Sequence, residues 1–208
     1  MIDNFELIKP LLNFENEGDF YMLYVFKRKK DQTTDKSNHQ SVRTIKTYCV
    51  ESIEYLEKRY EEIKQLCDIF RSRAYIHIQK QNHHDVSLEM MVALANKIRN
   101  GQHRQQHLFD SVVGQLKTLE KRWIVDIDTK DEEAVHRIAR LIDRLRPEGA
   151  KIESVIPTKS GYHFITKRFD VMEFNKIMSL QGDVPDIQKK NPTLLYLPDC
   201  LHQDIEHV

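Results

Sequence analysis

A short apolar segment that carries two carboxylates constrains the fold of this chain more than any other feature. Residues 123–127, with the sequence WIVDI, have the composition of a buried strand, yet Asp126 lies inside the segment and Asp128 follows it. An ionised carboxylate that is buried without a partner is costly. The strand therefore needs one apolar face that packs on a core and one polar face that compensates the two aspartates.

The elements around this segment follow a defined order. Two helices begin at capping signals, Thr129 with Glu132 and Asp170 with Glu173. Apolar spacing and turn residues predict, in chain order, a strand over 122–127, a helix closed by Pro147 and Gly149, strands over 151–157 and 162–166, a helix to about 180, and a last strand over 193–197. The order β-α-β-β-α-β is typical of ferredoxin-like and RRM-like units.

The first 120 residues predict a separate mixed lobe. Its predicted elements are strands over 20–28 and 41–50 with a polar loop between them, a helix over 53–70 with one apolar stripe, a strand over 74–78, a helix that ends at 100–101, and a helix over about 104–119. We therefore expect a mixed α/β fold of the α+β class. Residues 1–120 would form the N-terminal lobe and residues 121–208 the C-terminal, RRM-like lobe of one compact unit.

The composition excludes several classes of protein. Hydrophobic residues make up 40% and charged residues 31%, and the formal net charge is zero, so any surface that binds nucleic acid must be local. No apolar run is long enough to span a membrane, and the first residues lack a signal-peptide pattern. The three cysteines are far apart and form no metal-binding spacing. We expect a cytoplasmic protein that does not contact a membrane.

The predicted topology brings polar side chains together. In a β-α-β-β-α-β sheet the first strand is central, and its neighbours, the third and fourth strands, run antiparallel to it. Because side chains alternate between faces, Asp126 and Asp128 point away from the helices, and His163 on the third strand matches that face. Asp186 lies on the loop that enters the fourth strand. We expect three carboxylates and a histidine to converge at one edge of an open sheet face.

Divalent cations are the expected compensation for clustered carboxylates. Hard oxygen ligands suit Mg²⁺ or Mn²⁺, and such ions usually bind substrate phosphates as well. Two such ions can activate an attacking oxygen and stabilise a leaving one. The alternative is a solvated pair at the end of a strand, with Asp128 near a helix N-terminus, where a negative charge is favourable.

Three segments resemble the motifs of the archaeo-eukaryotic primase superfamily. They are IVDID at 124–128, TKSGYH at 158–163 and PDIQKKNPTLLYLP at 185–198. They are similar to a hydrophobic-D-x-D motif, a small-x-H motif and a hydrophobic-D motif before the closing strand. The resemblance covers about residues 120–202, and the preceding half fits the extra N-terminal lobe of that family. The sequence departs from the pattern at Pro185, where the family has a hydrophobic residue, and in a short gap between the second and third motifs.

The resemblance implies a primase-polymerase that adds nucleotides on a single-stranded DNA template, with nucleoside triphosphates as substrates and Mg²⁺ or Mn²⁺ as cofactor. It implies that Asp126 and Asp128 bind a metal pair and that Asp186 completes the catalytic site. His163 and Ser160 would contact the phosphates of the incoming nucleotide. A helicase or another replication protein is an implied partner.

Basic residues near these motifs extend the predicted site. Lys159, Lys167 and Arg168 flank the histidine strand, where triphosphate or template would meet them. The run KRKK at 27–30 is either a contact for a nucleic-acid backbone or a solvated surface.

Two alternatives remain open from the sequence. Asp170 is another candidate for the third carboxylate, although a helix-capping role also explains it. The alternative function is a non-catalytic module that binds single-stranded nucleic acid, or a replication accessory protein. An RRM-like module normally has aromatic residues on its open face, whereas Ile124, Asp126, Asp128 and His163 are expected there.

Overall fold

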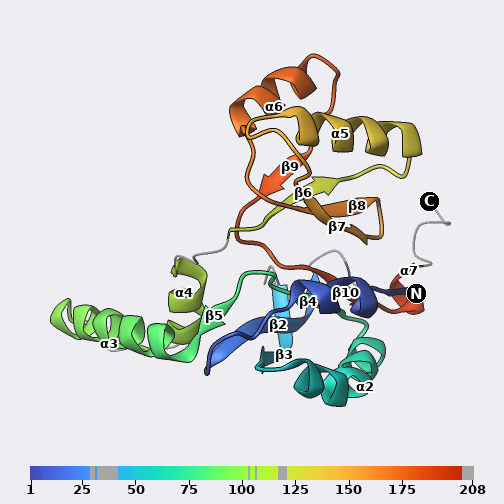
Figure 1. Ribbon diagram of the computed structural model, residues 1–208. Helices are drawn as coiled ribbons and strands as arrows, with labels where there is room; N and C mark the ends of the chain where they lie inside the picture. The colour runs from blue at the N-terminus through green and yellow to red at the C-terminus, as the bar shows by residue number, and fades with distance from the viewer. Residues whose placement is uncertain (29–30, 32–41, 103, 106, 117–120, 203–208) are drawn as a thin grey trace.

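Two antiparallel sheets form the framework of this protein (Figure 1). The computed structural model describes residues 1–28, 31, 42–102, 104–105, 107–116 and 121–202. Within these residues, helices and strands alternate in a mixed α/β arrangement, which confirms the predicted α+β class. No helix in the described ranges is both long enough and apolar enough to cross a membrane.

The first sheet has the strand order β1-β10-β4-β2-β3, and the short strand β5 also pairs with β2. Its strands are β1 Ile2–Asp3, β2 Asp19–Arg28, β3 Val42–Val50, β4 Arg73–Ile76, β5 Gln81–Asn82 and β10 Thr193–Leu197. The accompanying helices are α1 Phe5–Ile8, the 3₁₀ helix η1 Lys9–Leu11, α2 Ile53–Phe70, α3 His83–Arg99, α4 Leu108–Gln115 and α7 Asp199–His202. The predicted stripe of α2 is confirmed from Leu56 to Cys67, which packs into the core of this sheet, whereas Phe70 at its end is exposed.

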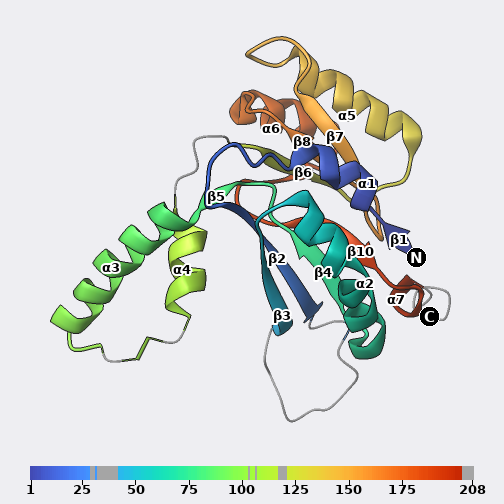
Figure 2. The same cartoon turned by 60° about the horizontal axis from the view of Figure 1, so that its bottom comes forward.

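The second sheet has the strand order β7-β8-β6-β9. Its elements are β6 Trp123–Ile127, α5 Glu132–Arg144, β7 Ile152–Pro157, β8 Tyr162–Thr166, α6 Val171–Ser179 and β9 Asp186–Gln188. The connectivity is β-α-β-β-α-β, and β6 lies between β8 and β9, as expected for the first strand of such a unit. Helices α5 and α6 cover the face that turns away from the first sheet (Figures 1 and 2).

One strand of the prediction is wrong. Residues 193–197 do not form the fourth strand of the second sheet but lie between β1 and β4 in the first sheet. All five residues of this strand are buried, because a central strand that is apolar on both faces needs cover on both. The fourth strand is instead the short β9. The chain therefore returns to the first sheet after β9.

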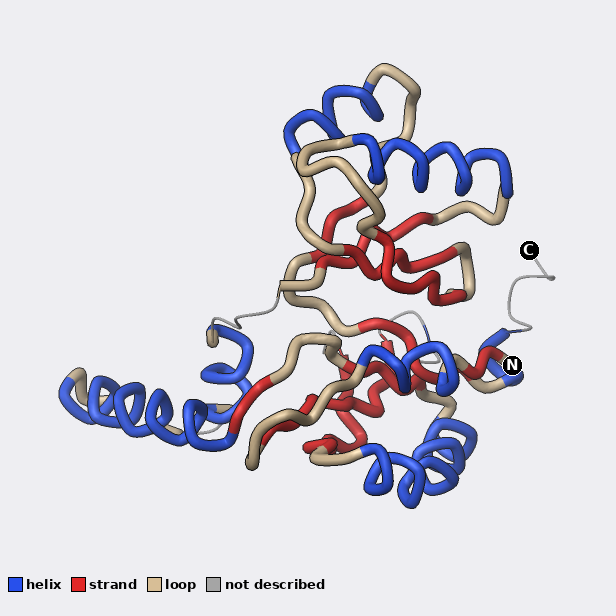
Figure 3. Tube along the Cα trace, in the orientation of Figure 1, coloured by secondary structure: helices blue, strands red, loops and turns tan. Residues whose placement is uncertain are grey.

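The two sheets share a core, so the second sheet has no fully open face. Ile124, Ile156 and Ile165 pack into the cluster that holds the first sheet and α2. The buried Asn4 side chain donates from Nδ2 to the carbonyl oxygens of Pro157 and Leu194, both at 2.9 Å. Figure 3 shows the strands of the two sheets on facing layers, with α5 and α6 beyond one layer and α2 beyond the other. The expected open face is therefore accessible only in part.

The starts of the two helices on the second sheet test the capping predictions. Asp170 caps α6 as predicted, since its side chain accepts a hydrogen bond from the backbone N–H of Glu173 at 3.0 Å. Helix α5 differs, because Asp131 rather than Thr129 is the N-cap and accepts from the N–H of Glu133. Thr129 accepts instead from the N–H of Asp131. Part of the predicted helix over 104–119 lies outside the described residues.

Candidate functional site

The register of the second sheet places Asp126 between two predicted site residues. Asp126 on β6 pairs with His163 on β8 and with Asp186 on β9. Residues that are paired directly across antiparallel strands point to the same face. Asp126 and His163 therefore share one face as expected, and Asp186 lies on the same face of the neighbouring strand.

The Asp126 carboxylate has a defined set of partners. Its Oδ1 lies 3.4 Å from His163 Nε2, and its Oδ2 accepts a hydrogen bond from Gln188 Nε2 at 3.1 Å. The hydrogen bond with His163 is the largest cause that lowers the pKa of the Asp126 carboxyl, while burial opposes it. Asp126 is therefore held as a carboxylate.

The His163 ring is buried and both of its nitrogens have partners. Nε2 faces Asp126, and Nδ1 lies 2.9 Å from the hydroxyl oxygen of Thr193 on β10. In the neutral tautomer with the proton on Nε2, the Thr193 hydroxyl donates to Nδ1 and Nε2 donates to Asp126. The strand that returns to the first sheet thus orients the histidine.

Asp128 is joined to the turn before β8. The Ser160 hydroxyl donates to Asp128 Oδ1 at 2.9 Å. Gly161 allows this close approach, because a Cβ atom at that position would lie 1.9 Å from the carbonyl oxygen of Ile127. Ser160 therefore contacts Asp128, and Gly161 packs on the backbone on either side of this aspartate, at one end of β6.

A cavity of about 300 Å³ lies where this end of the second sheet meets the first sheet. The second sheet and its turn contribute Asp126, Asp128, Thr158, Lys159, Ser160 and His163. The remaining lining residues are Arg28, Asp31, Arg73, Tyr75 and Leu194. The cavity thus combines carboxylates from one sheet with guanidinium groups from the other.

The cationic side of the cavity is built on β2 and β4. The Arg28 guanidinium lies over the Tyr75 ring, 5.2 Å from its centroid, and its charge also lowers the pKa of Asp126. Arg73 Nη2 forms a buried ion pair with Asp31 Oδ1 at 2.7 Å. Among the described residues, Arg73 Nε and Asp31 Oδ2 are buried polar atoms without a hydrogen-bond partner. Such atoms are rare in folded proteins, and a bound polar ligand is one explanation for them.

The other predicted site residues divide into two groups. Lys159 lines the cavity, and its Nζ donates to the carbonyl oxygen of Leu201. Asp186 is exposed, and although it lies opposite Asp126 it does not line the cavity. Lys167 and Arg168 follow the far end of β8 and do not line it either, and Arg168 lines a different pocket.

Sequence reasoning missed the groups that come from the first lobe. Arg73, Asp31 and Tyr75 lie outside the three motifs, and no spacing links them to Asp126. The basic run at 27–30 is a partial signal, since its second residue, Arg28, faces the cavity. Residues 29–30 of that run lie outside the described residues.

The donor chemistry of the site fits a hard divalent cation. Asp126 and Asp128 supply carboxylate oxygens, which Mg²⁺ and Mn²⁺ prefer. In the described part of the chain, no three His, Cys, Asp or Glu side chains are gathered closely enough to hold a metal ion. A cation held by the two aspartates competes with the hydrogen bonds from Gln188 and Ser160.

Comparison of the chain with protein-family models, with curated proteins and with solved structures found no match. The side chains of the cavity and the three motifs therefore guide the assignment of function.

Proposed function

We propose that this protein is a metal-dependent nucleotidyltransferase of the primase-polymerase type. It would add nucleotides from nucleoside triphosphates to a strand paired with a single-stranded DNA template. We place it in the cytoplasm, in the company of other replication proteins such as a helicase.

The observation that carries the proposal is the pairing of charges in one cavity. Asp126 and Asp128 lie on one side, and Arg28 lies on the other beside the ion pair of Arg73 with Asp31. A triphosphate bound with a divalent cation needs both kinds of group, because carboxylates hold the cation and guanidinium groups bind phosphate oxygens. A cavity with carboxylates alone or guanidinium groups alone would support only half of this chemistry.

The three carboxylates would share the task of binding the metal ions. Asp126 and Asp128 would hold the metal ions, and Asp186 lies across the strand from Asp126 to complete the set. When bound, the ions would activate the attacking oxygen and neutralise charge on the leaving group. His163 supports this site because it holds Asp126 as an oriented carboxylate.

The reaction proposed is an in-line displacement at phosphorus. The 3′-oxygen of the growing strand forms a bond to the α-phosphorus, the bond to the bridging oxygen of pyrophosphate breaks, and the hydroxyl proton passes to solvent. Arg28, Arg73 and Lys159 would bind and orient the triphosphate, and Ser160 would contact a phosphate oxygen.

The alternative of an RRM-like binding module has less support. Such a module reads bases on an exposed sheet face. Here Ile124 and Ile165 on that face are buried against the first sheet. The end with Asp126, Asp128 and His163 borders a cavity. Charged groups rather than aromatic platforms therefore meet a ligand at this face.

Calorimetry with a nucleoside triphosphate and Mn²⁺ tests the proposal. The wild-type protein should bind the nucleotide only with metal, and Asp128→Asn should lose this binding while it keeps its thermal midpoint. Asp68→Asn on α2, an exposed aspartate that does not line the cavity, is the matched control and should bind like wild type. Metal-independent binding, or full binding by a folded Asp128→Asn variant, would contradict the metal-site assignment.

Primer-extension and primer-synthesis assays on single-stranded DNA then test catalysis. The proposal requires that strand growth depends on Mg²⁺ or Mn²⁺ and stops in Asp126→Asn. Metal-dependent nucleotide binding without any strand growth would favour the alternative that this protein is a non-catalytic replication accessory protein.

A further inference from the structure

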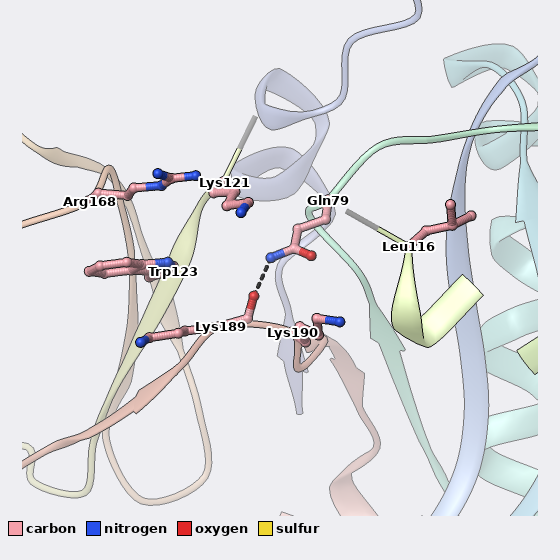
Figure 4. Close-up of a pocket in the computed structure, with 7 residues that line it drawn as sticks. All are labelled: Gln79, Leu116, Lys121, Trp123, Arg168, Lys189 and Lys190. Carbon is pink, nitrogen blue, oxygen red and sulfur yellow. Dashed lines mark hydrogen bonds between the residues drawn. The ribbon is translucent and has the colours of Figure 1, made fainter. Parts of the chain in front are cut away.

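A second pocket, rich in lysine and arginine, lies at the opposite end of β6 from Asp126 and Asp128. Its volume is about 290 Å³. The lining consists of Gln79, Leu116, Lys121, Trp123, Arg168, Lys189 and Lys190. Figure 4 shows the Trp123 ring between the side chains of Arg168 and Lys189, with Lys121 close by. The proposed reaction does not use any of these residues.

The Trp123 ring is fixed in place but not enclosed. It packs against the Phe169 ring in a T-shaped arrangement, at a centroid distance of 5.6 Å and an interplanar angle of 71°. The Lys189 ammonium lies 5.2 Å from the centre of the ring. Lys189 is exposed, so a flat ligand group can replace its ammonium on the ring without opening the core.

The charged side chains that line the pocket in the described part of the chain are all positive. Among the described residues that line it, four are cationic and none is acidic. In the part of the chain that the structure describes, no carboxylate forms an ion pair with Lys121, Arg168 or Lys189. Lys190 donates to the carbonyl oxygen of Gly114 at 2.8 Å, which joins this segment to α4. Cations that are gathered without counter-ions attract a polyanion.

The backbone under these cations is held by specific contacts. The Gln79 side chain donates from Nε2 to the carbonyl oxygens of Arg122 and Lys189, one on each side of the pocket. The hydrogen bond to Lys189 is drawn in Figure 4. These bonds keep the strand with Trp123 and the segment with Lys189 at a fixed spacing. The positions of the ring and the cations are therefore set by the fold.

We propose that this pocket binds single-stranded nucleic acid. A base stacks on the Trp123 ring, displaces the Lys189 ammonium, and leaves it beside the neighbouring phosphate. Lys121 and Arg168 contact further phosphates. An aromatic platform with adjacent cations is the combination that proteins use to bind single strands without reading their sequence.

The position of the pocket connects it to the candidate active site. Lys189 directly follows Gln188, whose side chain donates to Asp126. A nucleic-acid strand bound at Lys189 would therefore contact the residue next to Gln188, and Gln188 contacts Asp126 of the candidate active site. The route from pocket to cavity rests on the proposed function, but binding of the strand in the pocket does not.

Trp123 is the only tryptophan of the chain, so its fluorescence reports directly on the pocket. Titration with an unlabelled oligothymidylate should quench it in a saturable manner. The Arg168→Gln/Lys189→Gln double variant changes two exposed side chains and should bind the oligonucleotide about tenfold more weakly. The slope of log affinity against log salt should become shallower by about 0.7 for each phosphate that the variant no longer neutralises.

Three comparisons make the test decisive. Lys176→Gln, at an exposed lysine on α6 outside the pocket, should bind like wild type. Asp126→Asn should keep oligonucleotide binding even if it loses nucleotide binding, which separates this inference from the proposed function. Trp123→Phe, followed by anisotropy of a labelled oligonucleotide, should bind more tightly than Trp123→Leu. Equal affinity of the double variant and wild type, or equal quenching by inorganic phosphate at the same phosphate concentration, would overturn the proposal.

Discussion

Asp126 on β6 and Asp186 on β9 lie directly opposite each other in adjacent antiparallel strands. Like charges in that position destabilise a sheet unless something offsets them. Asp126 has His163 and Gln188 as partners, whereas Asp186 is exposed. The arrangement is explained if a cation binds near the pair when nucleotide is present.

The third carboxylate can be identified by a pair of substitutions. We expect Asp186→Asn to lose metal-dependent nucleotide binding and to keep or slightly raise the free energy of unfolding, because a like-charge pair is removed. We expect Asp170→Ala to keep binding and to lose about 1 kcal/mol of stability, because Asp170 caps α6. Calorimetry and urea denaturation measure both. The reverse pattern would make Asp170 the functional carboxylate.

The assignment of His163 to the face of Asp126 shows how much of the site is predictable from the sequence. Alternation along residues 123–127 and 162–166 is sufficient, because both strands are regular and have one apolar face. The ring lines the candidate cavity, but it is largely buried and its Nδ1 faces Thr193, a contact that the sequence does not predict. Thr193 belongs to a strand of the other sheet, and a contact between sheets has no periodicity that a sequence pattern can reveal.

The assignment of residues 193–197 failed for a different physical reason. The segment TLLYL is apolar on both faces, so it fits any buried position in either sheet. The true fourth strand, β9, has three residues and pairs at an edge, which gives too little alternation to recognise. Arg73 and Asp31 were missed for a related reason, since their role depends on how the first sheet meets the second.

The pKa of Asp126 gives a direct test of its contact with His163. The hydrogen bond with His163 is the largest cause that lowers this pKa from its ordinary value of 3.8. We therefore expect His163→Phe to raise the pKa of Asp126, as measured from the chemical shift of its carboxyl carbon in an NMR titration. Glu62, whose pKa is lowered by its hydrogen bond with Lys46, serves as the internal reference and should keep the same pKa in both proteins. An unchanged Asp126 titration would refute the proposed role of the ring.

Gly161 should tolerate no side chain. A Cβ atom there would lie 1.9 Å from the Ile127 carbonyl oxygen and 2.8 Å from the backbone of Thr129, so the turn must shift away from β6. We expect Gly161→Ala to cost about 1–3 kcal/mol in urea denaturation and to weaken nucleotide binding, because Ser160 moves with the turn.

Gly114→Ala is the matched control. That position lies in α4 with open space around it, so the substitution should be neutral or stabilising. Equal stability of the two variants would contradict this close packing.

His77 should make the stability of the protein depend on pH. Its ring packs edge-on against Tyr24 at 5.6 Å, and burial lowers the pKa of His77 from 6.5 to about 4. Between these two pH values the unfolded chain binds a proton that the folded chain does not, so the free energy of unfolding falls as the pH is lowered. The contribution is fully present above pH 6.5, and the loss on reaching pH 4 is at most about 3 kcal/mol.

Urea denaturation across this range should show a smaller pH dependence for His77→Phe than for wild type. His136→Gln, at an exposed position on α5, should behave like wild type, and identical pH profiles for wild type and His77→Phe would show that His77 does not carry this dependence.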